Sequence, residues 1–201
     1  MSWPSGTYGF PKTSTSCPDM WIPGWRKQIM EDDSGTGSTS LSTDLRMHMD
    51  VSLVDYALTR HFCTKTIDSG GSQKAWPGGM YCIYKKNQCP SGMKDGFIKW
   101  DDEDTPNKDG NDKHGILPDG EFGTTDGNDL ATKISYCCND QGDWKQSIEL
   151  PVNEPFYLLP HQSKNCQRVK GALSTLEHIT YDTEDSNNHD ALQGSHAYKD
   201  D

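Results

Sequence analysis

Residues 76–107 read WPGGMYCIYKKNQCPSGMKDGFIKWDDEDTPN and decide the fold class. Two turns, WPGG and CPSG, reverse the chain there, because proline fixes φ and glycine tolerates positive φ. Each turn leads into a short run, 80–84 and 96–100, that is rich in the aromatic and β-branched residues typical of strands. An acidic loop follows at 101–107. The stretch therefore predicts a β unit made of turn, strand, turn, strand and acidic loop.

The unit recurs along the chain. Gly6 and Tyr8 match Gly79 and Tyr81 at an offset of 73, and Cys17-Pro18 matches Cys89-Pro90 at an offset of 72. ALTRHFC at 57–63 matches ATKISYC at 131–137, and a looser copy has FYLL at 156–159 with Cys166 as its turn cysteine. Repeats of this length usually contain one supersecondary unit per copy. We predict a single domain, 1–201, built of about three repeats: 3–63, 76–138 and 153–198.

These observations predict an all-β, disulfide-stapled domain with pseudo-threefold organisation. A β-prism is the first architecture we expect, and a β-trefoil or an irregular β-sandwich are the alternatives. No stretch keeps a helical period of 3.6 residues, so helices should be few. We expect residues 34–44 and 64–75 to be loops, 145–151 and 156–159 to be strands, and the tail from Asp182 to be polar.

Composition and charge limit the classes of partner. Apolar residues make up 32% of the chain, so the core is small for the length and disulfides would offset part of that weakness. The net charge of −11 argues against nucleic acid and anionic membrane surfaces as direct partners. No apolar stretch is long enough to span a membrane and no signal peptide is present, so we expect a domain excised from a longer precursor with partner domains upstream.

Seven cysteines are present: Cys17, Cys63, Cys82, Cys89, Cys137, Cys138 and Cys166. None forms a C-x-x-C pair, which argues against structural zinc, and a cysteine-rich, loop-rich chain fits an oxidising compartment. Seven is an odd number, so at least one thiol is free or bonds outside this chain. The adjacent Cys137 and Cys138 should bond two different partners.

The acidic loops are candidate calcium sites, because calcium takes six to eight hard oxygen ligands. The central loop offers Asp101, Asp102, Glu103, Asp104 and Asn107, and similar groups stand at 31–33 and 182–188. The spacing does not match an EF-hand. Solvated Asx-turn loops between strands are the alternative, so we expect no required cofactor, with calcium as the candidate ion.

No catalytic signature is present, and we predict a protein that is not an enzyme. Neighbouring carboxylates in one loop rarely act on one substrate, and the chain has no nucleophile elbow or zinc-protease motif. Two tryptophans outside the repeated motifs, Trp21 and Trp144, are candidate platforms for sugar rings, with core packing as the alternative. Lys85 and Lys86 are the first candidates for a cationic contact, ahead of 25–27 and 164–170.

The motifs WPSGTYGFP, WPGGMYCIYKK, CPSG, IKWDDED, LPDGEFG, YCC, PFYLL and YDTEDSNN resemble the ApeC domain, the C-terminal domain of apextrin-like proteins. The resemblance covers nearly the whole chain in the same motif order, although the family pattern has eight cysteines. It implies a secreted invertebrate module that recognises bacterial peptidoglycan or its muramyl dipeptide unit in innate immunity. A structural or adhesive extracellular module with protein partners, or a calcium-dependent lectin, are the alternatives.

Overall fold

The computed structural model describes residues 2–30, 38–42, 47–67, 74–102, 111–122, 130–183 and 188–200. Its regular structure over these residues consists of β-strands, which confirms the all-β prediction. No described segment forms a helix that could cross a membrane. The strands are β1 (Tyr8–Pro11), β2 (Ile22–Ile29), β3 (Ser40–Leu41), β4 (Val51–Val54), β5 (Ala57–Lys65), β6 (Tyr81–Lys85), β7 (Lys94–Asp101), β8 (Asp112–Gly115), β9 (Gly120–Phe122), β10 (Ala131–Asn139), β11 (Leu159–Pro160), β12 (Ile179–Thr180) and β13 (Ala191–Gly194).

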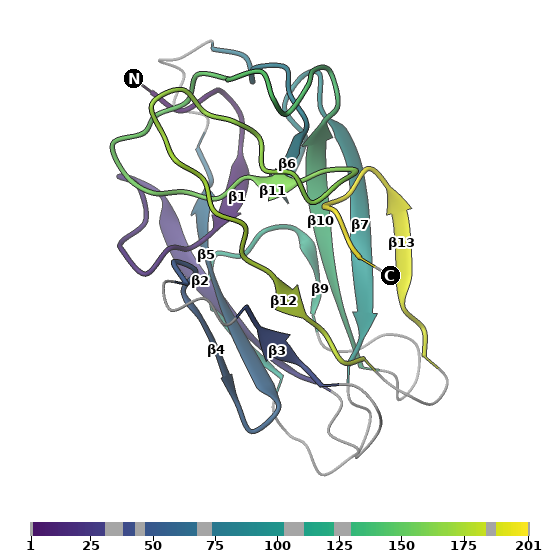
Figure 1. The fold of residues 1–201 in the computed structure, drawn as a ribbon. Helices are drawn as coiled ribbons and strands as arrows, with labels where there is room; N and C mark the ends of the chain where they lie inside the picture. The colour runs from purple at the N-terminus through teal and green to yellow at the C-terminus, as the bar shows by residue number, and fades with distance from the viewer. Residues whose placement is uncertain are drawn as a thin grey trace.

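Two three-stranded units dominate one large open sheet. Its strand order is β13-β7-β10-β6-β1-β5-β2-β8, and each pairing is antiparallel. β5 lies between β1 and β2, and β10 lies between β6 and β7, so both units have the same internal order. Figure 1 shows the two units on opposite sides of the molecule, joined where β1 meets β6.

The sequence repeat between these units is also a structural repeat. The Tyr8 hydroxyl donates to the Pro4 carbonyl at 2.8 Å, and the Tyr81 hydroxyl donates to the Pro77 carbonyl at 2.6 Å. The turn after each proline is equivalent too, with the amides of residues 21 and 93 donating to the carbonyls of residues 18 and 90 at 3.0 and 3.1 Å. Equal residues at equal offsets therefore make equal local contacts.

The third stretch of the chain pairs differently. β11 joins β6, β12 joins β3 in a separate two-stranded sheet, and β13 joins β7. Of the described strands of residues 153–198, β11 and β13 thus add to the second unit and β12 pairs with β3, and they form no third triplet. This pairing does not confirm the pseudo-threefold repeat or the β-prism. Most of the three acidic loops, including Glu31, Glu103 and Glu184, lies outside the described residues.

Several local predictions differ from the structure. The predicted loop at 34–44 contains β3, and the predicted linker at 64–75 begins inside β5. The predicted strand at 145–151 contributes only an isolated bridge between Ile148 and Val169. In the short strands, pairing with a distant segment decides the conformation, because two to four residues carry too little periodicity of their own.

Hydrophobic clusters cover both faces of the sheet. The first contains Tyr8, Phe10, Trp21, Trp76, Tyr81, Ile83, Cys137, Ile148 and Leu150, with Trp3 and Phe156 packed against it. The second contains Phe62, Tyr84, Ile98, Trp100, Ile134, Tyr136 and Cys138, with Tyr181 packed against it. Neighbours in a strand point to opposite faces, which explains why Cys137 and Cys138 belong to different clusters.

Three disulfides connect the strands and turns. Cys17–Cys63 and Cys89–Cys137 are equivalent in the two units, with a Cα separation of 5.4 Å in each. Cys82–Cys138 joins directly opposite residues of β6 and β10, where the first unit has Gly9 opposite Thr64. The adjacent cysteines bond two different partners, as expected, and Cys166 is the free cysteine.

Candidate ligand-binding site

An open cavity of about 320 Å³ lies beside the first hydrophobic cluster. Its walls come mainly from residues 152–158 and 166–177, and Thr13 and His48 complete the lining. Phe156, Leu158 and Val169 make an apolar floor that packs against the core. A cavity with an apolar floor and a few polar groups at its wall is the usual form of a small-molecule site.

Glu177 holds the cavity walls together. One carboxylate oxygen accepts from the His48 amide at 2.7 Å and contacts the His48 Nδ1 at 2.8 Å. The other accepts from the Met49 amide at 3.2 Å and from the Tyr157 hydroxyl at 2.5 Å. Burial opposes the charge, but these hydrogen bonds outweigh it and lower the pKa of Glu177. Residues far apart in the sequence are thereby fixed in one preformed site.

Cys166 lines the cavity and is half-buried. Burial raises the pKa of its thiol, so the thiolate is disfavoured at neutral pH. An activated nucleophile requires the opposite shift. Cys166 is therefore a wall residue whose thiol is a chemical handle on the cavity.

The two lysines ranked first from the sequence are paired within the chain. Lys85 Nζ lies 3.1 Å from a carboxylate oxygen of Asp95. Lys86 Nζ donates to the Leu117 carbonyl at 3.0 Å and lies 3.5 Å from Asp119. Both side chains are about three-quarters covered, at 23% exposure. Neither lysine lines the cavity.

The two candidate tryptophans have different environments. Trp21 is only 8% exposed, and the rings of Phe10 and Trp3 lie 5.0 and 5.6 Å from it, so it is a core residue. Trp144 is half-buried, and two cations lie near its ring: Lys145 Nζ at 5.4 Å and Arg168 Cζ at 5.8 Å from the centroid. Of the four candidates for ligand contact, Trp144 is the one with a partly open aromatic surface next to cations.

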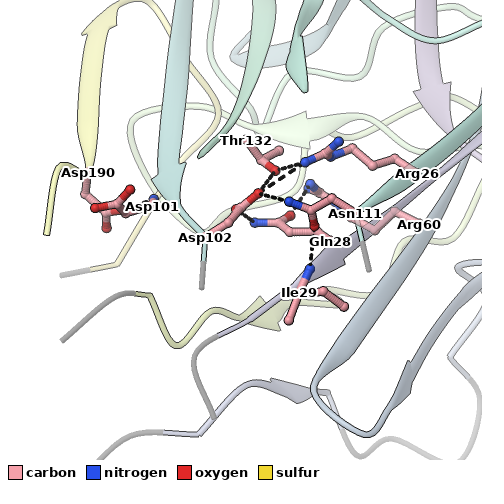
Figure 2. Close-up of polar contacts among 9 residues, drawn as sticks. All are labelled: Arg26, Gln28, Ile29, Arg60, Asp101, Asp102, Asn111, Thr132 and Asp190. Atoms are coloured by element: carbon pink, nitrogen blue, oxygen red, sulfur yellow. Dashed lines mark hydrogen bonds and ion pairs between the residues drawn. The ribbon is translucent and has the colours of Figure 1, made fainter. Parts of the chain in front are cut away.

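Two predicted calcium ligands, Asp101 and Asp102, are buried, and the other three, Glu103, Asp104 and Asn107, lie outside the described residues. Figure 2 shows the Asp102 side chain pointing into a polar network while Asp101 points away toward Asp190. The Asp101 carboxylate accepts from the His189 amide at 2.7 Å, and its own amide donates to Asp190 at 2.8 Å.

The Asp102 carboxylate is bound on both oxygens by hydrogen-bond donors. Oδ2 accepts from Thr132 at 2.7 Å and from Arg26 and Asn111 at 3.2 Å, and Oδ1 accepts from Gln28 at 2.6 Å. Arg26 also donates to the Thr132 hydroxyl. This network joins the two units of the sheet, and calcium binding by the loop stays a prediction.

A second buried arginine continues the network. Arg60 donates to Gln28 at 2.9 Å and to the Tyr181 hydroxyl at 2.8 Å (Figure 2 shows the Gln28 end). Its guanidinium also lies 5.3 Å from the Trp100 ring centroid and 5.5 Å from that of Tyr181. The charges of Arg26, Arg60 and Asp102 thus bridge β2 and β5 of the first unit to β7 of the second.

Burial decides the protonation of the Asp102–Arg26 pair. Desolvation raises the pKa of Asp102 to about 6 despite Arg26 and the hydrogen bonds, and it lowers the pKa of Arg26 to about 10. Desolvation is the largest cause of both pKa shifts, so keeping this pair charged in the folded protein costs free energy.

We expect Asp102 to make the domain less stable as the pH rises from about 4 to about 6. The folded carboxyl keeps its proton to a higher pH than the unfolded one, so the folded state binds more protons in this window and stability falls with rising pH. A shift from 3.8 to about 6 corresponds to about 3 kcal/mol. Urea unfolding at several pH values measures the unfolding free energy of the native protein minus that of Asp102→Asn. This difference should fall by up to that amount as the pH rises through the window. A difference that is flat or rises with pH would contradict the assignment.

Within the described residues, one group of three potential metal ligands is close together: Cys82, Cys138 and His161. The two sulfur atoms bond each other in a disulfide and are not available as thiolate ligands. This group is therefore not a metal site in the oxidised protein.

The sequence did not reveal the cavity residues His48, Tyr157 and Glu177. None of the three belongs to a recognisable motif. The contact between His48 and Glu177 joins residues that are 129 positions apart, so no local pattern in the sequence could reveal it. Arg168 lies in the basic stretch 164–170, which the sequence did single out, but nothing in the sequence places it beside Trp144.

Comparison with known proteins gives one family. No curated protein and no solved structure is detectably similar to the chain. Residues 3–201 match the model of the family described as the C-terminal domain of apextrin, ApeC, so the chain belongs to the ApeC family.

Proposed function

We propose that the domain recognises bacterial cell-wall glycan, namely peptidoglycan and its muramyl dipeptide unit, without catalysing a reaction. The observation that carries this proposal is the preformed cavity, with its apolar floor and polar wall. Family membership and three disulfides fit an extracellular protein, and we propose a secreted module of invertebrate innate immunity.

The lining suits uncharged sugar groups. Thr13, Asn153 and Ser174 offer hydroxyl and amide partners for sugar hydroxyls and acetamido groups, and Phe156 and Leu158 offer an apolar surface for the methyl of an acetyl group. Ligand recognition of this kind needs no net charge at the cavity. It is therefore compatible with a protein whose net charge is −11.

The cavity is poorly suited to hydrolyse a glycan. Two carboxylates, Glu154 and Glu177, line it, and a glycosidase needs one carboxyl that stays protonated near neutral pH. The pKa of Glu177 is shifted downward and both of its oxygens accept hydrogen bonds. Glu177 is therefore a structural anion, which favours binding over catalysis.

We expect Ser174→Trp to abolish most binding to insoluble peptidoglycan, because residue 174 lines the cavity and an indole there would occupy space that the ligand needs. Leu176→Trp is the matched control: it lies two residues away, is 43% exposed, and does not line the cavity. Co-sedimentation of both variants and the native domain, with and without EDTA, measures the effect. Equal binding by the two variants would move the site away from the cavity.

Modification of the Cys166 thiol provides a second, independent test of whether a ligand occupies the cavity. A thiol reagent added to the native domain should modify this one cysteine slowly, since burial raises its pKa. Muramyl dipeptide should slow the modification further by occupying the cavity.

The co-sedimentation experiment also separates the alternative functions. Peptidoglycan binding that is lost in EDTA would support the calcium-dependent lectin, and a native domain that binds no peptidoglycan would support an adhesive module with protein partners.

A further inference from the structure

Trp144 and Arg168 are held together by a tight set of backbone bonds. The Arg168 amide donates to the Trp144 carbonyl at 3.0 Å, and the Ile148 amide donates to the Arg168 carbonyl at 3.0 Å. Gln167, which is 4% exposed, ties the same segments through its side-chain amide to the Gln146 carbonyl at 2.7 Å. The segment 144–148 therefore presents its side chains from a fixed backbone.

The loop that carries Trp144 is also locally ordered. Asp143 accepts the Lys145 amide on its carboxylate at 2.9 Å and the Gln146 amide on its backbone carbonyl at 2.9 Å. Such an Asx turn fixes the direction of the next side chains. The indole of Trp144 thus stands half-exposed, with the exposed side chains of Lys145 and Arg168 near its ring.

These two cations are exposed, and they differ from the other described cations near aromatic rings. Lys133, near Phe97, pairs with Glu121. Lys65 and Arg60 are buried, and their side chains donate hydrogen bonds within the chain. No ion pair found among the described residues includes Lys145 or Arg168. In a protein with a net charge of −11, two such cations around one indole make a local basic spot.

We propose that Trp144, Lys145 and Arg168 form a subsite for a sugar that carries a carboxylate, a proposal that rests on the proposed function. An indole face contacts the C–H face of a pyranose ring, while a guanidinium and an ammonium group bind a carboxylate through charge-assisted hydrogen bonds. The cavity would take the uncharged groups of the polymer, and this subsite would take its acidic sugar. Muramic acid and a uronic acid share this chemistry.

The experiment compares three sugars at millimolar concentration by NMR titration: N-acetylmuramic acid, N-acetylglucosamine and glucuronic acid. The first two differ by the 3-O-lactyl group, which carries the carboxylate, so the part of their affinity ratio that is lost on removing the cations measures the contribution of Lys145 and Arg168. We expect the native domain to prefer the acidic sugar about tenfold, as for a charge-assisted hydrogen bond. The glucuronic acid arm shows whether any sugar carboxylate suffices or the muramic lactyl group is required.

The double variant Lys145→Gln/Arg168→Gln should bind N-acetylmuramic acid and N-acetylglucosamine equally, and Trp144→Leu should weaken both. Lys164→Gln is the control, since it removes one exposed positive charge from the neighbouring stretch. The melting temperature of each variant shows that it is folded. Added salt should weaken binding of the acidic sugar only.

Each outcome decides for or against the subsite. A native domain without preference for the acidic sugar, or a double variant that keeps the preference, overturns it. If the double variant also binds insoluble peptidoglycan as the native domain does while Ser174→Trp does not, the subsite fails and the proposed function stands. If the native domain binds no peptidoglycan, the proposed function itself fails.

Discussion

Full reduction of the three disulfides is expected to unfold this domain at about 25 °C. Each bond closes a loop with a sequence separation of 46 to 56 residues. The loop-closure entropy of such loops contributes about 4 kcal/mol per disulfide. The Cys89–Cys137 loop lies inside the Cys82–Cys138 loop, so the three contributions are less than additive, but together they still approach the whole stability of a typical domain, about 5–15 kcal/mol. The apolar fraction of 32% is small, so hydrophobic burial contributes little additional stability once the disulfides are reduced.

Thermal melts with and without reductant, followed by circular dichroism, measure this effect. Removing one bond at a time, as in Cys89→Ser/Cys137→Ser, should cost about 2–5 kcal/mol. Cys166→Ser is the control, because the half-buried Cys166 is in no disulfide and the variant should melt close to the native domain. A melting temperature unaffected by complete reduction would contradict the role assigned to the disulfides.

Arg26→Met is expected to destabilise the domain by about 3–5 kcal/mol at about pH 8. The change keeps most of the side-chain volume but removes the cation beside Asp102, whose side chain is fully buried. Asp102 would then be a buried anion with the hydrogen bonds of Gln28, Thr132 and Asn111 and, as its remaining cation, the more distant Arg60. The loss should shrink at about pH 5, because the carboxyl can take up a proton there.

Urea unfolding at both pH values measures the loss. Lys170→Met is the matched control, because it breaks an exposed ion pair. The side chains of Lys170 and Glu149 are 73% and 55% exposed, so losing this pair should cost no more than about 1 kcal/mol. If both variants lose the same stability, the Asp102 network does not join the two units as the structure indicates.

The two β units and their turns could be predicted from the sequence. The motifs WPSG and WPGG begin equivalent turns, and the matched residues lie in equivalent strands, Tyr8 and Tyr81 in β1 and β6, and 57–63 and 131–137 in β5 and β10. Turn chemistry and side-chain alternation act over a few residues, so a single sequence reveals them. The different partners of Cys137 and Cys138 follow from the same alternation.

The strand pairing does not confirm the threefold symmetry inferred from the looser third copy. Phe156 and Cys166 resemble the matched positions of the first two units, yet β13 extends the sheet beyond β7, and β11 pairs with the part of β6 that β1 does not cover. A motif predicts a local conformation, while the pairing of a strand depends on which sheet edge is open. Which edge is open depends on the folded sheet, so it cannot be predicted from a local motif.

Turn chemistry, side-chain alternation and the cysteine count were enough to predict an all-β, disulfide-stapled domain of turn-and-strand units with at least one cysteine outside its internal disulfides. The folded chain was needed to show that Lys85 and Lys86 are paired and that Trp21 is a core residue. It was also needed to show that Asp102 lies in a buried network and that His48 and Glu177 close a cavity. Ion pairs, burial and cavities depend on segments as far apart as the 129 positions between His48 and Glu177. Alternation tells which residues share a face of a strand, but only the folded chain determines what covers that face.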